Sequence, residues 1–302
     1  MIGRVVRIGG KTFDVTTEAG RLTCEFRGRL KKEKQAVVRL VAVGDQVEVT
    51  LKEGTEGIIE KVLPRRSKLS RPSAANSRKE QVIVANVDTI LIVESARNPD
   101  FDPLTVDRCT VMASAAAIPA ALCVNKTDLG LVSGLEVYAS LNIPVFHTSA
   151  IRGEGIDKLR SFLDHKTTVF IGPSGVGKSS LLNALHPAAG VKTGKVSDRT
   201  GGGRHTTTWA ELVEVGPGTF VTDTPGLEIF ALWEITPLGL RDYFPEFVEP
   251  GSRCKYRDCS HTAEPKCAVL EAVRSGAIHA SRHKHYVSIR KSLVEQHKLF
   301  EY

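Results

Sequence analysis

The chain contains the octapeptide Gly172-Pro173-Ser174-Gly175-Val176-Gly177-Lys178-Ser179, which fits the pattern G-x-x-x-x-G-K-[ST]. A strand-like apolar run at 167–171 precedes it, and an apolar segment at 180–185 follows it. In this setting the glycines let backbone N–H groups turn inward around phosphate, and the helix N-terminus favours negative charge. We expect Lys178 to be catalytic and to reach the β- and γ-phosphates, and Ser179 to be a Mg²⁺ ligand. The predicted nucleotide contacts here are Gly172, Pro173, Ser174, Gly175, Val176, Gly177, Lys178, Ser179 and Ser180.

A second motif, Asn125-Lys126-Thr127-Asp128, comes earlier in the chain and directly follows the strand-like run 121–124. In a loop at a strand end, the Asp128 carboxylate can accept hydrogen bonds from guanine N1–H and its exocyclic amine, which adenine does not offer. Asn125 is expected to meet the N7/O6 edge, and the Lys126 stem to lie over the purine face. Ser149 and Ala150, in Thr148-Ser149-Ala150, follow another strand-like run and can present a backbone amide to guanine O6.

An apolar strand ending in D-x-x-G lies downstream of the phosphate loop, at 220–226. Asp223 stands where an acid can hold Mg²⁺ through water, and the Gly226 amide can sense the γ-phosphate. The D-x-x-G pattern is common by itself. Its place after a phosphate loop and at the end of a strand makes it informative.

The segment 198–208, between the phosphate loop and D-x-x-G, is rich in glycine and threonine. We expect Thr207, with Thr206 next, to offer a hydroxyl to Mg²⁺ and an amide to the γ-phosphate. Leu227 follows D-x-x-G, where many GTPases place the glutamine that orients the attacking water. His205 is the nearest polar candidate for that catalytic role. The alternative is that His205 contacts RNA or solvent. In either case we expect unaided hydrolysis to be slow.

The order of these motifs is unusual, because the guanine-reading motif precedes the phosphate loop. A layered domain can be cut at one surface loop and rejoined at another without change to its core. We therefore predict a circularly permuted P-loop GTPase domain, with Asp102 as the cap of a helix that begins at Pro103. The segment after Gly226 then leads into the C-terminal module, so that nucleotide state can reposition that module. The predicted strands are 89–94, 120–124, 144–147, 167–171 and 219–223.

Residues 1–63 form short runs of alternating apolar and polar residues separated by glycine-containing turns. About five strands in about 60 residues indicate a small OB-type β-barrel, although SH3-like barrels use similar patterns. Both kinds of barrel commonly bind RNA or proteins. The stretch 64–80 is basic, contains Pro64 and Pro72, and shows no clear periodicity. We expect it to be a linker or a mobile arm.

A cysteine–histidine cluster, Cys254-x4-Cys259-x-His261-x5-Cys267, places four soft ligands close together in the C-terminal region. Three thiolates and one imidazole suit a structural, tetrahedral Zn²⁺ ion. The alternative is a set of scattered buried or redox cysteines. The other three cysteines lie in apolar or periodic settings and are expected to be core thiols; they are Cys24, Cys109 and Cys123.

The composition is that of a globular protein of 302 residues, with 41% hydrophobic and 25% charged residues and a net charge of +7. Six basic residues lie in 21–34 and six more in 64–80, which indicates a polyanionic partner such as nucleic acid. No apolar run is long enough to span a bilayer, and the N-terminus lacks the pattern of a signal peptide. The cytoplasm is therefore the expected location. Further basic and aromatic residues are candidates either for RNA phosphate or for a solvated helix face, namely Lys255, Tyr256, Arg257, Arg282, His283, Lys284 and His285.

Taken in this order, the motifs resemble those of the ribosome small subunit-dependent GTPase A family, and the resemblance covers essentially the whole chain. It implies a multidomain α/β protein with an OB-fold at 1–68, a circularly permuted GTPase domain at 69–235 and a helical zinc-binding domain at 236–302. It also implies a GTPase of late small-subunit maturation, which binds rRNA and GTP or GDP and is stimulated by the subunit. His205 falls on the family's proposed catalytic histidine. We expect a monomer with no membrane partner.

Two other functions remain open from the sequence. One is an RNA- or protein-bound GTP switch whose hydrolysis is incidental. The other is a housekeeping GTPase that acts on a different RNA, such as tRNA. Stimulation of hydrolysis by small ribosomal subunits separates the first function from these two.

Overall fold

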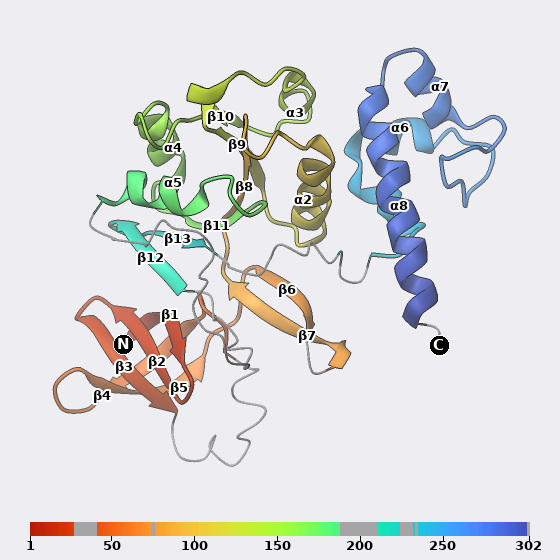
Figure 1. Ribbon diagram of the computed structural model, residues 1–302. Coiled ribbons are helices and arrows are strands. Elements are labelled where there is room, and N and C mark those ends of the chain that lie inside the picture. Colours follow the sequence, from red (N-terminus) through yellow and green to blue (C-terminus); the bar gives the residue numbers. More distant parts are fainter. Residues whose placement is uncertain (27–40, 74–75, 188–210, 224–231, 233–234, 301–302) are drawn as a thin grey trace, which may run out of the picture.

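Five short strands form a closed barrel at the N-terminus of the computed structural model (Figure 1). The structure describes residues 1–26, 41–73, 76–187, 211–223, 232 and 235–300. The barrel order is β1-β2-β3-β5-β4, with β4 paired back to β1, and β3 and β5 run parallel. This confirms the predicted OB-type barrel. The barrel strands are β1 (Ile2–Gly9), β2 (Thr12–Thr17), β3 (Gly20–Phe26), β4 (Gln46–Leu51) and β5 (Glu56–Val62).

A hairpin, not a linker, occupies much of the basic stretch after the barrel. Strands β6 (Lys68–Ser73) and β7 (Asn76–Ala85) pair antiparallel in a two-stranded sheet of their own. Leu69 and Val84 are buried, and the Lys68 ammonium lies 2.7 Å from the Glu80 carboxylate. The expectation of a linker or mobile arm at 64–80 was therefore wrong. The strand pattern is hidden in the sequence because basic residues and a proline interrupt it.

The central sheet has six strands in the order β10-β9-β8-β11-β13-β12. All neighbours are parallel except β12 and β13, which pair antiparallel. The five strands predicted for this region are confirmed. Strand β12 was not foreseen from the sequence. The sheet consists of β8 (Thr89–Ser95), β9 (Ala120–Asn125), β10 (Val145–His147), β11 (Thr167–Ile171), β12 (Glu211–Gly216) and β13 (Thr219–Asp223).

Helices cover both faces of this sheet (Figure 1). On one face, α2 (Pro103–Ala115) packs against alternate residues of β8 such as Ile90 and Ile92. On the other face, α4 (Ile156–Leu163) and α5 (Lys178–Leu185) pack against Leu91 and its neighbours. The predicted helix start is confirmed, because the Asp102 carboxylate accepts hydrogen bonds from the amides of Leu104 and Thr105. Two shorter elements complete the domain, η2 (Thr127–Leu129) and α3 (Glu136–Ala139).

The C-terminal module is helical and lies on the outer side of α2 (Figure 1). Its core is aromatic: the rings of Phe244, Phe247 and Tyr286 lie with centroids 4.9–5.2 Å apart. The Tyr286 hydroxyl donates to the Ser260 carbonyl at 2.8 Å, which fastens the last helix to the loop carrying the Cys/His cluster. The elements are η4 (Gly239–Tyr243), α6 (Pro245–Gly251), α7 (Ala268–Arg274) and α8 (Ala280–Phe300).

A buried carboxylate joins the barrel to the segment that follows it. Asp45 is fully buried and accepts two hydrogen bonds from the Arg65 guanidinium, at 2.7 and 2.8 Å, and one from the Ala42 amide at 2.7 Å. At the amino end of the central sheet, Arg4 of β1 donates to the Thr167 hydroxyl at 2.5 Å. The barrel therefore contacts the sheet at the amino ends of its strands. The motif loops lie at the opposite, carboxyl ends.

Replacement of Asp45 by alanine should destabilise the protein by about 3 kcal/mol, because it leaves the Ala42 amide and the Arg65 guanidinium without their buried acceptor. The matched control is Asp157→Ala, which removes an exposed ion pair with Arg160 and should change the free energy of unfolding by less than about 0.5 kcal/mol. Urea unfolding of both variants measures the difference. Equal effects at the two positions would contradict this account.

Candidate active site and metal centre

The phosphate loop lies between the carboxyl end of β11 and the start of α5, and two of its glycines have no room for a side chain. At Gly172, with φ of 150°, a Cβ atom would lie 2.0 Å from the Val93 carbonyl oxygen. At Gly177, with φ of 97°, it would lie 2.4 Å from the Asn125 side-chain nitrogen. The Lys178 ammonium lies across the loop, 2.9 Å from the carbonyl oxygen of Gly172. The backbone conformation therefore requires glycine where the sequence motif has it.

The guanine-reading loop is hydrogen-bonded directly to the phosphate loop. Asn125 donates through its side-chain amide to the Val176 carbonyl at 3.0 Å. Lys126 donates to the Gly175 carbonyl at 2.6 Å and also to the Asn98 carbonyl. The two motifs are far apart in the chain, yet they form one continuous site at the carboxyl edge of the sheet.

Asp128 is held by the Thr-Ser-Ala loop. The Ser149 hydroxyl donates to the Asp128 carboxylate at 2.6 Å, and this hydrogen bond lowers the pKa of Asp128. The carboxylate is therefore ionised at neutral pH and able to accept from a guanine edge. The Ala150 amide donates to the Asn125 side-chain oxygen at 3.2 Å. The predicted base contacts Asn125, Lys126, Asp128, Ser149 and Ala150 thus lie together, beside the predicted phosphate contacts 172–180.

Part of the predicted site lies outside the described residues. This holds for His205, Thr206, Thr207 and Gly226. The backbone of Asp223 is described at the end of β13, where it pairs with Phe170 of β11. This pairing places the D-x-x-G strand next to the phosphate-loop strand.

The loop at 95–102 contributes contacts that the sequence did not reveal. The Ser95 hydroxyl donates to the Pro99 carbonyl at 2.6 Å, and the Ala96 amide donates to the Asn125 carbonyl at 2.8 Å. Together with the Asn98 acceptor for Lys126, these bonds fix the loop against the guanine reader. Backbone acceptors carry no residue signature, so no sequence pattern could have identified them.

Glu94, near the carboxyl end of β8, is a buried acid behind the site. It is fully buried, and among the described residues neither of its carboxylate oxygens has a hydrogen-bond partner. Burial, with a smaller contribution from the charge of Asp102, raises the pKa of Glu94 to about 8. The side chain is therefore mainly protonated at neutral pH.

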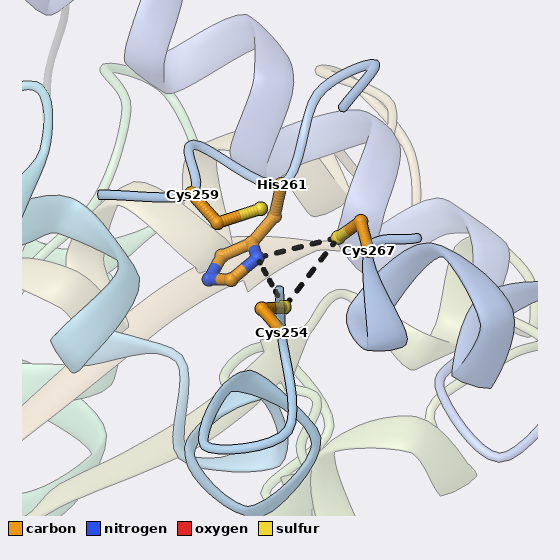
Figure 2. Close-up of side chains that lie close together, drawn as sticks. All are labelled: Cys254, Cys259, His261 and Cys267. Carbon is orange, nitrogen blue, oxygen red and sulfur yellow. Dashed lines mark hydrogen bonds between the residues drawn. The ribbon is translucent and has the colours of Figure 1, made fainter. Parts of the chain in front are cut away.

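The four predicted metal ligands converge in the C-terminal module (Figure 2). The Cys254 sulfur lies 3.8 Å from the Cys267 sulfur and 3.6 Å from His261 Nδ1, which is 3.4 Å from Cys267. A tetrahedral Zn²⁺ ion with Zn–S near 2.3 Å and Zn–N near 2.0 Å requires edges of about 3.8 and 3.5 Å. The Cys259 sulfur completes the group, whose ligand atoms all lie within 4.8 Å of one another. The arrangement therefore fits a tetrahedral metal ion.

Burial and hydrogen bonds together set the protonation of these ligands. Burial lowers the pKa of His261, which keeps the imidazole neutral as a ligand must be, and it raises the pKa of the Cys259 thiol to about 12. Burial also acts to raise the pKa of Cys254, but hydrogen bonds from the backbone at Ala268 and Val269 outweigh it and lower that pKa. Binding of a metal therefore releases protons from the cluster. The other three cysteines, Cys24, Cys109 and Cys123, are buried free thiols, as expected.

The basic residues of α8 correct one of our expectations. Arg282 is 2% exposed and forms ion pairs with Asp107 at 2.5 Å and with Glu246 at 2.6 Å. His285 Nδ1 lies 2.6 Å from the other Asp107 oxygen, and the His283 ring is hydrogen-bonded to the His261 carbonyl at 2.7 Å. Arg282 therefore neither lies on a solvated helix face nor is free to bind RNA phosphate, because its guanidinium is paired with two carboxylates inside the protein.

The phosphate-loop motif lies at the carboxyl ends of parallel strands and is hydrogen-bonded to the predicted guanine reader, which precedes it in the chain. This arrangement is that of a circularly permuted P-loop GTPase. The model of the RsgA GTPase family matches residues 62–233, and that of the RsgA N-terminal domain matches residues 2–59. The chain therefore belongs to the RsgA GTPase family and is a GTP hydrolase.

Relatives and solved structures agree with this assignment. A protein of Gemmatimonas aurantiaca is 41% identical over 97% of both chains, and one of Caldanaerobacter subterraneus is 37% identical over 98% of this chain and 97% of its own. Both are named small ribosomal subunit biogenesis GTPase RsgA. The crystal structure of YjeQ from Thermotoga maritima covers 97% of this chain and 98% of its own with a TM-score of 0.79 and 34% identity. That of YloQ, described as a circularly permuted GTPase, covers 98% and 95% with a TM-score of 0.75 and 29% identity.

Among the residues that the structure describes, no helix combines the length and hydropathy needed to span a bilayer.

Removal of the metal should unfold the C-terminal module, because ligands drawn from three separate loop positions are then no longer held together. Purified protein is expected to hold one zinc per chain. We expect a strong chelator to lower the melting temperature of the module by about 10 °C. Cys267→Ser should give the same loss of metal, whereas Cys24→Ala should keep one zinc per chain. Protein that folds with no metal at the cluster would contradict the assignment.

Replacement of Glu94 by glutamine should change how stability depends on pH. An acid whose pKa is raised from 4.5 to about 8 on folding keeps its proton in the folded state after the unfolded state has lost it. The free energy of unfolding then falls by about 1.4 kcal/mol per pH unit between these values. Glu94→Gln removes this fall. Between pH 5 and pH 8, the free energy of unfolding of the variant should therefore rise by about 3 kcal/mol relative to that of wild type. Urea unfolding at several pH values measures this pH dependence. Glu136→Gln, at an exposed position, is the control. Parallel profiles for wild type and Glu94→Gln would refute the account.

Proposed function

We propose that the chain is a Mg²⁺-dependent GTPase that acts in the late assembly of the small ribosomal subunit. The observation that carries the proposal is the pair of hydrogen bonds by which Asn125 and Lys126 join the guanine reader to the phosphate loop. The names of the curated relatives, which cover nearly the whole chain, support the ribosomal role.

We assign the phosphate contacts to residues 172–180 and the base contacts to the Asn125–Asp128 and Ser149–Ala150 loops. The backbone amides of the phosphate loop and the Lys178 ammonium would hold the β- and γ-phosphates. Ser179 and Thr207 are the proposed Mg²⁺ ligands, with Asp223 acting through water and Gly226 and Thr206 facing the γ-phosphate. Bound Mg²⁺ would neutralise charge on the β- and γ-phosphate oxygens.

Hydrolysis transfers the γ-phosphoryl group to water: a P–O bond to the attacking water forms, and the bond to the β–γ bridging oxygen breaks. The products are GDP and phosphate. In the proposed mechanism Lys178 stabilises charge on the transferring group, and His205 orients the attacking water. Leu227 cannot do so, because a leucine side chain has neither donor nor acceptor.

We further propose three functional units, 1–68 for rRNA binding, 69–235 for GTP hydrolysis and 236–302 for a zinc-stabilised module. Exposed basic side chains support an RNA partner, among them Arg66 beside the barrel and Lys255 in the C-terminal module. The Cys254, Cys259, His261 and Cys267 cluster is the proposed Zn²⁺ site. A monomer in the cytoplasm is consistent with these roles.

Steady-state GTP hydrolysis with and without purified small ribosomal subunits tests the proposal. We expect stimulation of at least about tenfold for wild type, and loss of most of it in His205→Ala, because an unoriented water attacks slowly. Stimulation that survives in His205→Ala would assign the orientation of water to another group. Absence of stimulation in wild type would contradict the ribosomal role.

The base-reading assignment has its own test. Asp128→Asn replaces an acceptor-only carboxylate by an amide, so affinity should move from guanine to xanthine nucleotides. Competition binding with GDP and xanthosine diphosphate measures the exchange. An Asp128→Asn variant that binds GDP as wild type does would refute the assignment of the base site.

A further inference from the structure

The C-terminal module is joined to the GTPase domain through buried charges. Asp107, in the second turn of α2, is fully buried, and both of its carboxylate oxygens are engaged by side chains of α8. Arg282 takes one oxygen and His285 the other. The Arg282 guanidinium also pairs with Glu246 of α6 and lies 4.5 Å from the centre of the Phe244 ring. All its surroundings are thus supplied by protein.

This interface differs from an ordinary surface ion pair. The Arg282 and Asp107 side chains are 3% and 0% exposed, whereas Arg253 and Glu249 of the same module form a pair that is 62% and 73% exposed. A buried charge that loses its partner is strongly disfavoured, whereas an exposed one is hydrated by water. The position of α8 on α2 is therefore tightly specified at Asp107.

The start of α2 lies beside the predicted nucleotide site. Asp102 caps α2, and Asp107 is five positions further along the chain, which corresponds to about 7.5 Å along the helix axis. The loop that leads into this cap places the Asn98 carbonyl as an acceptor for Lys126. Lys126 in turn donates to the Gly175 carbonyl of the phosphate loop.

From this chain of contacts we infer that Arg282 is a positioning residue for guanine-nucleotide binding, acting through Asp107, the start of α2 and Asn98 on Lys126. The inference rests on the proposed guanine site. The contact of Arg282 with Asp107 fixes the position of α2 against the C-terminal module. The position of α2 in turn fixes the Asn98 carbonyl, which accepts a hydrogen bond from Lys126. By thermodynamic reciprocity, bound nucleotide strengthens the docking of α8 by the same factor as docking strengthens nucleotide binding.

The test measures the affinity and dissociation rate of fluorescently labelled GDP with the full-length, zinc-containing protein. Arg282→Met, which replaces the apolar stem of the side chain and removes the charged guanidinium, should weaken GDP binding about tenfold, mostly through faster dissociation. Arg253→Met is the matched control in the same module and should bind GDP as wild type does. Wild-type affinity in a folded Arg282→Met protein with one zinc per chain would overturn the inference.

A second measurement needs no variant, and it decides the question if Arg282→Met loses its metal or its fold. In wild type, saturating GDP should slow amide hydrogen exchange in the first turns of α8, at 282–288, by a similar factor. Unchanged exchange there would overturn the coupling. Asp128→Asn separates the two proposals: if its GDP affinity equals that of wild type, the base site is wrongly assigned, whatever Arg282→Met shows.

Discussion

The parallel pairing of β9, β8 and β11 brings three strand ends to one edge of the sheet, and the nucleotide site depends on it. The loop after β11 is the proposed phosphate loop, the loop after β9 is the proposed base reader, and the loop after β8 accepts a hydrogen bond from Lys126 of that reader. Because neighbouring strands lie about 4.8 Å apart, Lys126 after β9 can reach the Asn98 carbonyl in the loop after the neighbouring strand β8. Asn125 and Lys126 also reach carbonyls of the loop after β11, which is two strands away. Loss of this pairing would separate the two halves of the site.

The residues proposed for the site could be identified from the sequence, because their chemistry is distinctive, and the structure brings the described ones together. Gly172 and Gly177 are required by backbone conformation and close approach, and Asp128 by its acceptor-only carboxylate. The ligand cluster at Cys254–Cys267 could be recognised for the same reason. The barrel could be predicted because alternate positions of its short strands face one core, which leaves a period of two.

Other features could not be predicted, each for a physical reason. Strand β6 of the hairpin has one buried position, Leu69, so a period of two is obscured there by polar and charged residues. The Asn98 contact uses a main-chain carbonyl, which every residue possesses. Arg282 was misjudged because an arginine in a basic helix has the same local sequence whether it faces solvent or a buried carboxylate. That distinction is made by α2, which lies more than 160 residues earlier in the chain.

The strand order has a consequence for synthesis of the chain. Strands β8, β9 and β10 leave the ribosome before β11, and β11 then adds to the free edge of β8. Sheet growth can therefore start at the interior strand β8, proceed through β9 to β10, and continue with β11 on the other side of β8. Strand β13 is made last and lies between β11 and β12. The nascent chain first contains the proposed base-reading loop after β9. It contains the complete proposed phosphate loop only when α5 has emerged. A chain interrupted between these points carries half of the proposed binding site. When α5 has emerged, strands β8 to β11 are present and β12 and β13 are still to be made.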